Sequence, residues 1–329
     1  MENTLTPTRL STDGILDGDR SAPKAAQTEE ITVCICTYRR PELLERLLVA
    51  LAKQRTDGRF QFSCVVVDND AEASARATIE RLQPTLPFPI RYDVETARNF
   101  ALVRNRAIGL AEGKLFAFID DDEVPREDWL IRMLNILEEY GADAVLGPVR
   151  PYFDGEPPRW IVRSGVCDRP PHPTGMMLHW RKTRTGNVLL RASMIRDEGL
   201  RFDPAYGSGG EDIDFFRRAA EAGKNFVWCE EGAVYELVPE QRLRRSYHIK
   251  RAFLQGRLSL KYATDHPSFF AKARVGVKAF TAAVLYTMAL PVLFLLGDHL
   301  GMKYLVKDCH HIGRLLAMFG IEHSTKRDF

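Results

Sequence analysis

Apolar runs and amphipathic stretches alternate through the first 120 residues of the chain. The runs Ile31–Cys36 and Phe62–Val67 are mostly apolar, which is typical of strands that are covered on both faces of a sheet. Leucines recur at helical spacing between them, over Glu42–Gln54. Further helix patterns lie at Ala73–Leu82 and Phe100–Leu110, and further strand patterns at Ile90–Val94 and Leu115–Ile119. Strands that alternate with helices in this way predict an α/β fold with a mostly parallel central sheet flanked by helices.

The strand predicted at Leu115–Ile119 ends in four consecutive acids, Asp120–Glu123. Adjacent carboxylates repel one another unless a cation lies among them, and ligands of open α/β sheets bind at the carboxyl ends of the strands. Mg²⁺ and Mn²⁺ bind one or two carboxylates together with phosphate oxygens. The run therefore favours a divalent cation that holds a nucleotide diphosphate. The alternative is an acidic first turn of a helix, because Pro125 follows.

Two other charged residues stand where a nucleotide could reach them. Asp68 follows the second apolar strand, and its carboxylate could accept a hydrogen bond from a base such as uracil. Aspartate is also a common turn residue. Arg104 lies in the helix that precedes the acidic strand and could grip a diphosphate with two hydrogen bonds. The alternative for Arg104 is a solvated helix face.

A glycine-rich turn, Gly207–Gly210, leads into Glu211 and Asp212 at the predicted start of a helix. Glycines allow a ligand to approach the backbone closely. A carboxylate on this turn could remove a proton from an attacking hydroxyl, and a partly dry pocket would raise its pKa toward that task. The alternative is that the acids only cap the helix.

Composition narrows the class of protein. The 329 residues suffice for one large α/β domain with appendages, and 45% hydrophobic and 27% charged residues are ordinary for a globular protein. A formal net charge of +2 gives no case for a nucleic-acid partner. Six cysteines without zinc-finger spacing predict reduced, buried thiols. Residues 1–29 are polar without an apolar run, which predicts a disordered tail and no signal peptide.

The C-terminal part has a different pattern. Ala279–Leu296 is eighteen residues without a charge, and the amphipathic stretch Leu300–Phe319 follows it. Basic residues flank the apolar run on both sides, so the positive-inside rule gives no orientation for a single crossing. We expect residues 261–329 to form a membrane-associated helical segment, either a shallow hairpin or a helix pair lying at the interface. The alternative is a buried helix of a soluble core.

Six short motifs occur in a characteristic order over residues 31 to 260. They are Thr37–Pro41, Val67–Asn69, Arg104–Arg106, Asp120–Asp122, Gly186–Asn187 and Gly210–Asp212. In order and spacing this set resembles the family 2 glycosyltransferases, which are inverting enzymes with the nucleotide-sugar-binding GT-A fold. Three segments, Asp68–Glu72, Val145–Arg150 and Gly209–Asp212, are similar to bacterial exopolysaccharide glucosyltransferases of the succinoglycan type.

The resemblance implies a role for each matching residue. Asp122 would ligate the metal ion, Asp212 would be the general base, and Glu211 would lie beside it near the acceptor. The expected donor-binding residues are Thr37 and Asp68 at the uracil, Asp120 at the ribose, and Arg39, Arg104 and Asp121 elsewhere on the nucleotide. Residues 30–147 would form the nucleotide-sugar-binding half of the domain and residues 148–260 the acceptor-binding half.

Two departures from the family pattern affect these expectations. Family members often have a metal-binding histidine where this chain has Tyr235, and His248 is either a substitute or an ordinary surface residue. Processive members carry Gln-x-x-Arg-Trp, whereas Gln241–Arg245 lacks the tryptophan, which favours the addition of one sugar. Trp160 is a candidate for stacking on an acceptor sugar, although a buried core position is the commoner fate of tryptophan.

The sequence thus predicts an inverting, non-processive transferase. It would move a hexose, expected to be glucose, from a UDP-sugar to a lipid-linked saccharide of the undecaprenyl diphosphate type, at the cytoplasmic face of the bacterial inner membrane. A sugar-1-phosphate nucleotidyltransferase is one alternative, but it would need a glycine-rich phosphate loop where Thr37–Pro41 has no glycine. A non-catalytic nucleotide-sugar-binding scaffold is another, and the presence of Asp120, Asp122 and Asp212 together argues against it.

Overall fold

The computed structural model describes residues 29–259 and 269–320. Its strands are β1 (Glu29–Thr37), β2 (Phe60–Asp68), β3 (Ile90–Val94), β4 (Leu115–Phe118), β5 (Glu123–Pro125), β6 (Ala144–Leu146), β7 (Val149–Tyr152), β8 (Val188–Arg191), β9 (Phe226–Trp228) and β10 (Val234–Leu237). Its helices are α1 (Pro41–Leu51), α2 (Arg76–Leu82), α3 (Phe100–Leu110), α4 (Trp129–Glu139), α5 (Arg159–Ser164), α6 (Ser193–Arg196), α7 (Glu211–Glu221), α8 (Arg245–Ser259), α9 (Phe269–Leu296) and α10 (Asp298–Met318). The tail expected at 1–29 lies outside the described residues apart from Glu29, which begins β1.

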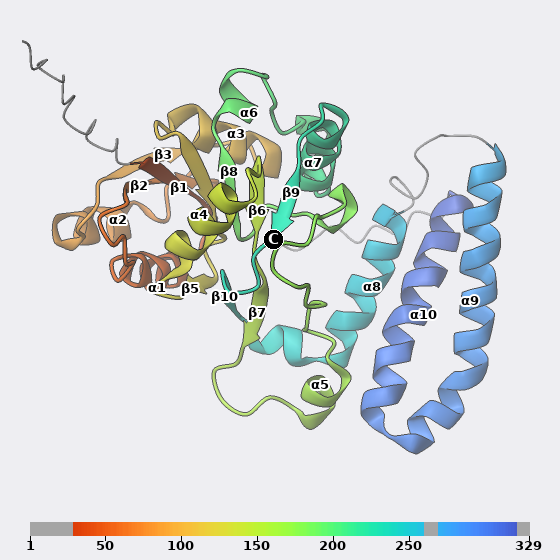
Figure 1. Ribbon diagram of the computed structural model, residues 1–329. Coiled ribbons are helices and arrows are strands. Elements are labelled where there is room, and N and C mark those ends of the chain that lie inside the picture. The colour runs from red at the N-terminus through yellow and green to blue at the C-terminus, as the bar shows by residue number, and fades with distance from the viewer. Residues whose placement is uncertain (1–28, 260–268, 321–329) are drawn as a thin grey trace, which may run out of the picture.

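Seven strands form the central sheet in the order β3-β2-β1-β4-β8-β6-β9 (Figure 1). Strand β8 is antiparallel to both of its neighbours, and the other pairs are parallel. The expected mostly parallel sheet is therefore confirmed. Strands β5, β10 and β7 form a second, smaller sheet. The expected division at residue 147 falls after β6, and strands from both sides of it share the central sheet.

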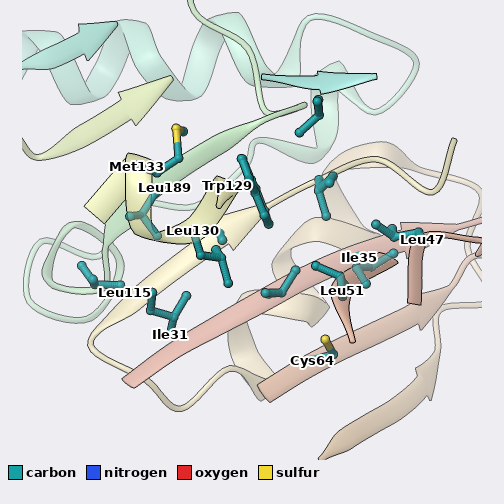
Figure 2. Packing of buried hydrophobic residues seen from close by; sticks show 14 of the residues in the cluster. Ile31, Ile35, Leu47, Leu51, Cys64, Leu115, Trp129, Leu130, Met133 and Leu189 are labelled. Carbon is teal, nitrogen blue, oxygen red and sulfur yellow. The ribbon is translucent and has the colours of Figure 1, made fainter. Parts of the chain in front are cut away.

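Helices cover both faces of the central sheet because each has one apolar side. In α1 the buried leucines are Leu44, Leu47, Leu48 and Leu51, one helical face that packs with α2 and α4 on one side of the sheet. Figure 2 shows residues of α1 and α4, such as Leu47 and Trp129, over Ile31 and Ile35 of β1. Helices α3 and α7 pack on the opposite face. The result is a three-layer domain in which the central sheet lies between two layers of helices.

The acidic run lies at the carboxyl end of β4. Strand β4 ends at Phe118, and the acids form the turn into β5, whereas the next helix, α4, begins only at Trp129. The alternative of an acidic helix N-terminus is therefore wrong. The register of β1 pairs Thr37 with Asp68 of β2, so the ends of these strands lie beside the acidic turn.

Asn187 joins four separate segments at the start of β8. Its side chain is fully buried, and its Oδ1 accepts a hydrogen bond of 2.8 Å from the indole of Trp129. Its Nδ2 donates to the carbonyls of Pro148 and Gly232, at 2.9 and 2.8 Å. The residue also adopts a positive φ of 61°, which asparagine tolerates better than most residues. Asn187 thus ties α4 and two loops to the antiparallel strand of the sheet.

The C-terminal helices stack in the order α8, α10, α9, with α9 outermost (Figure 1). Helices α8 and α10 approach closely at Gly256, where a Cβ would collide with the carbonyl of His310. Within the described residues, α9 alone is long and apolar enough to cross a membrane, with a mean hydropathy of 2.1 over its most apolar stretch within Lys272–Leu296. Only 11% of its most apolar stretch is buried, so α9 is not the buried core helix that was the alternative.

Replacing Asn187 with alanine should destabilise the domain by about 3 kcal/mol, because three buried groups lose their hydrogen-bond partners. Urea unfolding followed by circular dichroism measures the change. Asn135→Ala is the matched control: this asparagine is exposed on α4, and its loss should cost less than about 0.5 kcal/mol. Equal stability of the two variants would contradict the role given to Asn187.

Candidate active site

The acidic turn is held by side chains from the loop after β1. The hydroxyl of Thr37 donates a hydrogen bond of 2.8 Å to Oδ2 of Asp121. The Arg40 guanidinium donates to Oδ1 of Asp121 and to Oδ2 of Asp122, each at 3.1 Å. Thr37, expected at the uracil, is thus bonded to the acidic turn, and Arg40, which was given no role from the sequence, neutralises two of its carboxylates.

Burial and the crowding of like charges raise the pKa values of the turn. Burial, together with the charges of Asp120, Asp121 and Glu236, raises the pKa of Asp122 to about 7 against the opposing charge of Arg40. Burial also raises the pKa of Asp121. The fold therefore holds the carboxylates of this turn in an environment that disfavours their charge and favours a cation.

A missing side chain makes room for the turn. A Cβ on Gly186 would lie 2.9 Å from Oδ2 of Asp120 and 3.0 Å from Oε1 of Glu123. Glu123 itself is buried and accepts a hydrogen bond of 3.1 Å from the backbone N–H of Asp120. The glycine of the Gly186–Asn187 motif is thus needed for the close packing of the acids.

Helix α7 brings a second pair of acids to the same site. The Glu211 carboxylate at its start is buried and forms an ion pair with Arg104 of α3, so Arg104 is engaged with helix α7. Burial raises the pKa of Asp120, and the Arg104 guanidinium opposes this rise. The charges of Glu236 and Asp212 raise the pKa of Asp120 further. The carboxylates of Glu236 and Asp212 therefore both lie within electrostatic range of the acidic turn. The structure thus brings Asp212 and the acidic turn together.

Five arginines surround these carboxylates. They are Arg40, Arg104, Arg169, Arg184 and Arg242. Arg184 precedes the Gly186–Asn187 motif and interacts electrostatically with Asp212 and Glu123. Mixed charge of this density suits a polyanion that arrives with its own cation, since arginines bind phosphate oxygens and carboxylates bind the metal.

Two residues expected to bind the nucleotide, Asp68 at the uracil and Arg39 elsewhere, are both engaged with the loop after β2. Asp68 is fully buried and accepts hydrogen bonds from the backbone N–H groups of Asp70 and Ala75 and from the hydroxyl of Tyr92. It therefore shapes the loop after β2. Arg39 forms a two-pronged ion pair with Asp70, at 2.9 and 3.2 Å. The contacts of Asp68 and Arg39 with a nucleotide stay predictions.

An aromatic residue beside them had no role from the sequence. The guanidinium carbons of Arg39 and Arg98 lie 5.3 and 4.7 Å from the centre of the Tyr38 ring. Tyr38 belongs to the Thr37–Pro41 motif, and this membership is the feature of the sequence that could have indicated a role for it.

Residues 32–201 match the family model described as Glycosyl transferase family 2, which is more than half of the chain. The chain belongs to this family. It is 41% identical over 234 residues to the succinoglycan biosynthesis protein ExoM of Rhizobium meliloti strain 1021, covering 70% of this chain and 74% of that protein. It is 24% identical over 208 residues to the glycosyltransferase AglE of Haloferax volcanii, covering 61% and 64% of the two chains.

Solved structures agree on the fold. The mannosyltransferase PcManGT from Pyrobaculum calidifontis, in complex with GDP-Man and Mn²⁺, superposes with a TM-score of 0.57 at 18% identity, over 92% of this chain and 90% of that one. Staphylococcus aureus TarS 1–349 in complex with UDP gives 0.52 at 17% identity, over 88% and 92%. The protein is thus a family 2 glycosyltransferase with the GT-A fold.

The position of the family histidine differs in this glycosyltransferase. Glu236 pairs with Glu123 in the register of β10 and β5, and its charge acts on both Asp120 and Asp122. The His248 ring instead donates a hydrogen bond of 2.6 Å to the carbonyl of Arg242. Glu236, the neighbour of Tyr235, is therefore the additional side chain at the acidic turn.

The donor set fits a cation that is shared with a ligand. No group of three or more His, Cys, Asp or Glu side chains in residues 29–259 and 269–320 is arranged to hold a metal ion unaided. Asp122, at 11% exposure, offers a carboxylate oxygen whose neighbours are arginines. A divalent cation whose remaining ligands are phosphate oxygens needs no further carboxylate from the protein, and the neighbouring arginines can bind those phosphates.

Replacing Asp122 with asparagine should stabilise the free protein at pH 8. Because the folded-state pKa of Asp122 is raised to about 7, its contribution to stability is present in acid and is lost as the pH rises through that value. Relief on the order of 1–2 kcal/mol would raise the melting temperature by about 2–5 °C at pH 8, and by less at pH 5.

The same melting measurements, repeated with Mn²⁺ and UDP, supply the control. Wild type should gain stability from the pair of ligands, whereas Asp122→Asn should gain little. A variant that melts below wild type at pH 8 without ligands would show that the fold needs this carboxylate charged.

Proposed function

We propose that this enzyme is an inverting, non-processive transferase that moves a hexose, expected to be glucose, from a UDP-sugar to a lipid-linked saccharide in bacterial exopolysaccharide biosynthesis. The observation that supports the proposal is that the charge of Asp212 acts on Asp120 of the acidic turn and on Arg184, in a site that contains several arginines. The 41% identity to ExoM supports the pathway, and the UDP complex of TarS supports the nucleotide.

The chemistry is a single displacement at the anomeric carbon. An acceptor hydroxyl oxygen forms a bond to C1 of the hexose while the bond from C1 to the β-phosphate oxygen breaks, and UDP leaves with that electron pair. The Asp212 carboxylate accepts the hydroxyl proton. Attack from the face opposite the leaving group inverts the anomeric centre, as in other single-displacement reactions of sugars. Asp212 is held for this task by its position in the first turn of α7.

Asp122 would hold a divalent cation, Mg²⁺ or Mn²⁺, that also binds the diphosphate of the donor. When bound, the cation neutralises the charge that develops on the departing UDP. The Mn²⁺ in the PcManGT complex supports this assignment. Thr37 and Arg40 fix the acidic turn through their hydrogen bonds to Asp121 and Asp122, which holds the Asp122 carboxylate in one orientation. Asp120 lies beside Gly186 and is assigned to the ribose.

We further propose that helices α9 and α10 attach the enzyme to the cytoplasmic face of the inner membrane. The large apolar side chains that α9 exposes are Phe270, Val277, Phe280, Val284, Leu285, Met288, Val292, Leu295 and Leu296. Exposed basic residues flank this surface, at Lys272, Arg274 and Lys278 on α9 and at Lys303 and Lys307 on α10. An apolar helix with a basic rim suits an anionic bilayer, where a lipid-linked acceptor would also be found.

Asp212→Asn should lower the transfer rate by about 10²–10⁴-fold, because the amide cannot accept the hydroxyl proton. UDP affinity should change little. The assay follows UDP release and sugar incorporation into lipid-linked saccharides from radiolabelled UDP-sugars. Glu221→Gln, at the exposed end of the same helix, is the matched control and should keep full activity. Wild-type transfer by Asp212→Asn would refute the assignment, and pyrophosphate release would indicate a nucleotidyltransferase.

Met288→Glu with Leu295→Glu should reduce flotation with phosphatidylglycerol vesicles several-fold, because both side chains lie on the exposed face of α9, at 74% and 87% exposure. Val49→Glu with Met177→Glu removes two exposed apolar side chains from the catalytic domain and should float like wild type. Undiminished flotation of the α9 variant would contradict membrane attachment through this face.

A further inference from the structure

Arg242 bridges two carboxylates that belong to different parts of the site. Its guanidinium donates to Glu236 of β10, and its Nη2 lies 3.9 Å from Oδ2 of Asp122. The side chain is 22% exposed. Its charge therefore meets the metal-binding carboxylate on one side and solvent on the other.

The backbone of Arg242 is anchored, whereas its long side chain is partly exposed. The residue lies in the short 3₁₀ turn η4 (Glu240–Leu243). Its N–H donates to the carbonyl of Pro239 at 2.8 Å, and its own carbonyl accepts from His248 of α8 at 2.6 Å. A long side chain on an anchored backbone can shift its head group without moving the chain.

The two arginines at Asp122 are held with different strength. Arg40 makes hydrogen bonds of 3.1 Å to Asp121 as well as to Asp122, so it keeps a carboxylate partner if Asp122 is taken. Arg242 is too far from Asp122 for a hydrogen bond, and Glu236 is its principal partner. Asp122 can therefore exchange Arg242 for another cation at low cost.

We propose that Arg242 is the counter-ion of Asp122 while the donor site is free, and becomes a ligand of the donor diphosphate once a divalent cation takes its place at Asp122. The inference rests on the proposed function, which supplies the cation and the diphosphate. Glu236 is a positioning residue that keeps the guanidinium beside the acidic turn during the exchange. The displaced charge then lies next to the phosphates that arrive with the metal, where a guanidinium binds strongly.

The assignment differs from what the sequence pattern alone favours. In the Gln-x-x-Arg pattern the arginine is Arg244, whose side chain is exposed in the structure. Arg242, two residues earlier, is the one that contacts the acids. The pair of arginines thus gives a variant and a matched control on the same short segment.

The test measures binding rather than turnover. Mn²⁺ affinity without nucleotide is measured by electron paramagnetic resonance of the free ion, and UDP affinity in saturating Mn²⁺ by calorimetry. Arg242→Gln should bind Mn²⁺ about three- to tenfold more tightly, because an internal competitor is gone, and UDP about tenfold more weakly, because a charged hydrogen bond is lost. Arg244→Gln should match wild type in both measurements.

Opposite shifts in the two affinities support the proposal, whereas unchanged or weaker Mn²⁺ binding, or unchanged UDP binding, overturns it. If Arg242→Gln does not fold, as judged by circular dichroism, Arg242→Lys carries the test. Lysine keeps the charge but loses the forked donor, so Mn²⁺ affinity should stay at the wild-type value while UDP affinity falls about threefold. An unchanged UDP affinity of the lysine variant overturns the proposal. Wild-type protein that binds neither Mn²⁺ nor UDP would instead refute the proposed function itself.

Discussion

Repulsion among buried carboxylates is the interaction that the rest of the site has to balance. Strand β4 delivers Asp120, Asp121 and Asp122 to one edge of the sheet, and burial there removes the water that would otherwise screen their charges. Five arginines from other parts of the chain act on these carboxylates. The negative charge is nevertheless best satisfied by a further cation, because Asp122 keeps a raised pKa even beside Arg40. The excess negative charge of these carboxylates therefore determines both which side chains pack against the turn and which ligand it favours.

Much of the fold was predictable because its signals are local. The apolar runs, the leucine spacing of α1 and the acidic end of β4 each follow from side-chain periodicity within about ten residues. The start of α7 was predictable for the same reason, since glycines followed by acids mark a helix N-terminus. The site could be expected at the edge where parallel strands end, and the charge of Asp212 does act on the acidic turn there.

The remaining features depend on contacts between distant segments, which no local pattern encodes. Strand β8 runs antiparallel between β4 and β6, although its sequence reads like any other apolar run. Arg40 and Arg242 look like ordinary surface arginines until the fold sets them against Asp122. Asp68 shows the converse: its position at a strand end indicated a ligand contact, but the loop that follows supplies its hydrogen-bond donors. A polar residue at the end of a strand therefore indicates where a site lies, but it does not indicate which partner each side chain will contact.

One helix links the chemistry of the site to the exposed apolar surface. Helix α8 follows the turn that carries Arg242, and its His248 fixes the backbone of that residue. The same helix packs backbone to backbone on α10 at Gly256, and Arg245 at its start forms an ion pair of 2.6 Å with Asp298 at the start of α10. Helix α10 in turn supports α9, so the apolar face and the acidic turn are joined through packed elements and not through a loop. A bilayer that binds α9 would therefore also set the orientation of the donor site, which is what an enzyme needs when one substrate is soluble and the other is held in lipid.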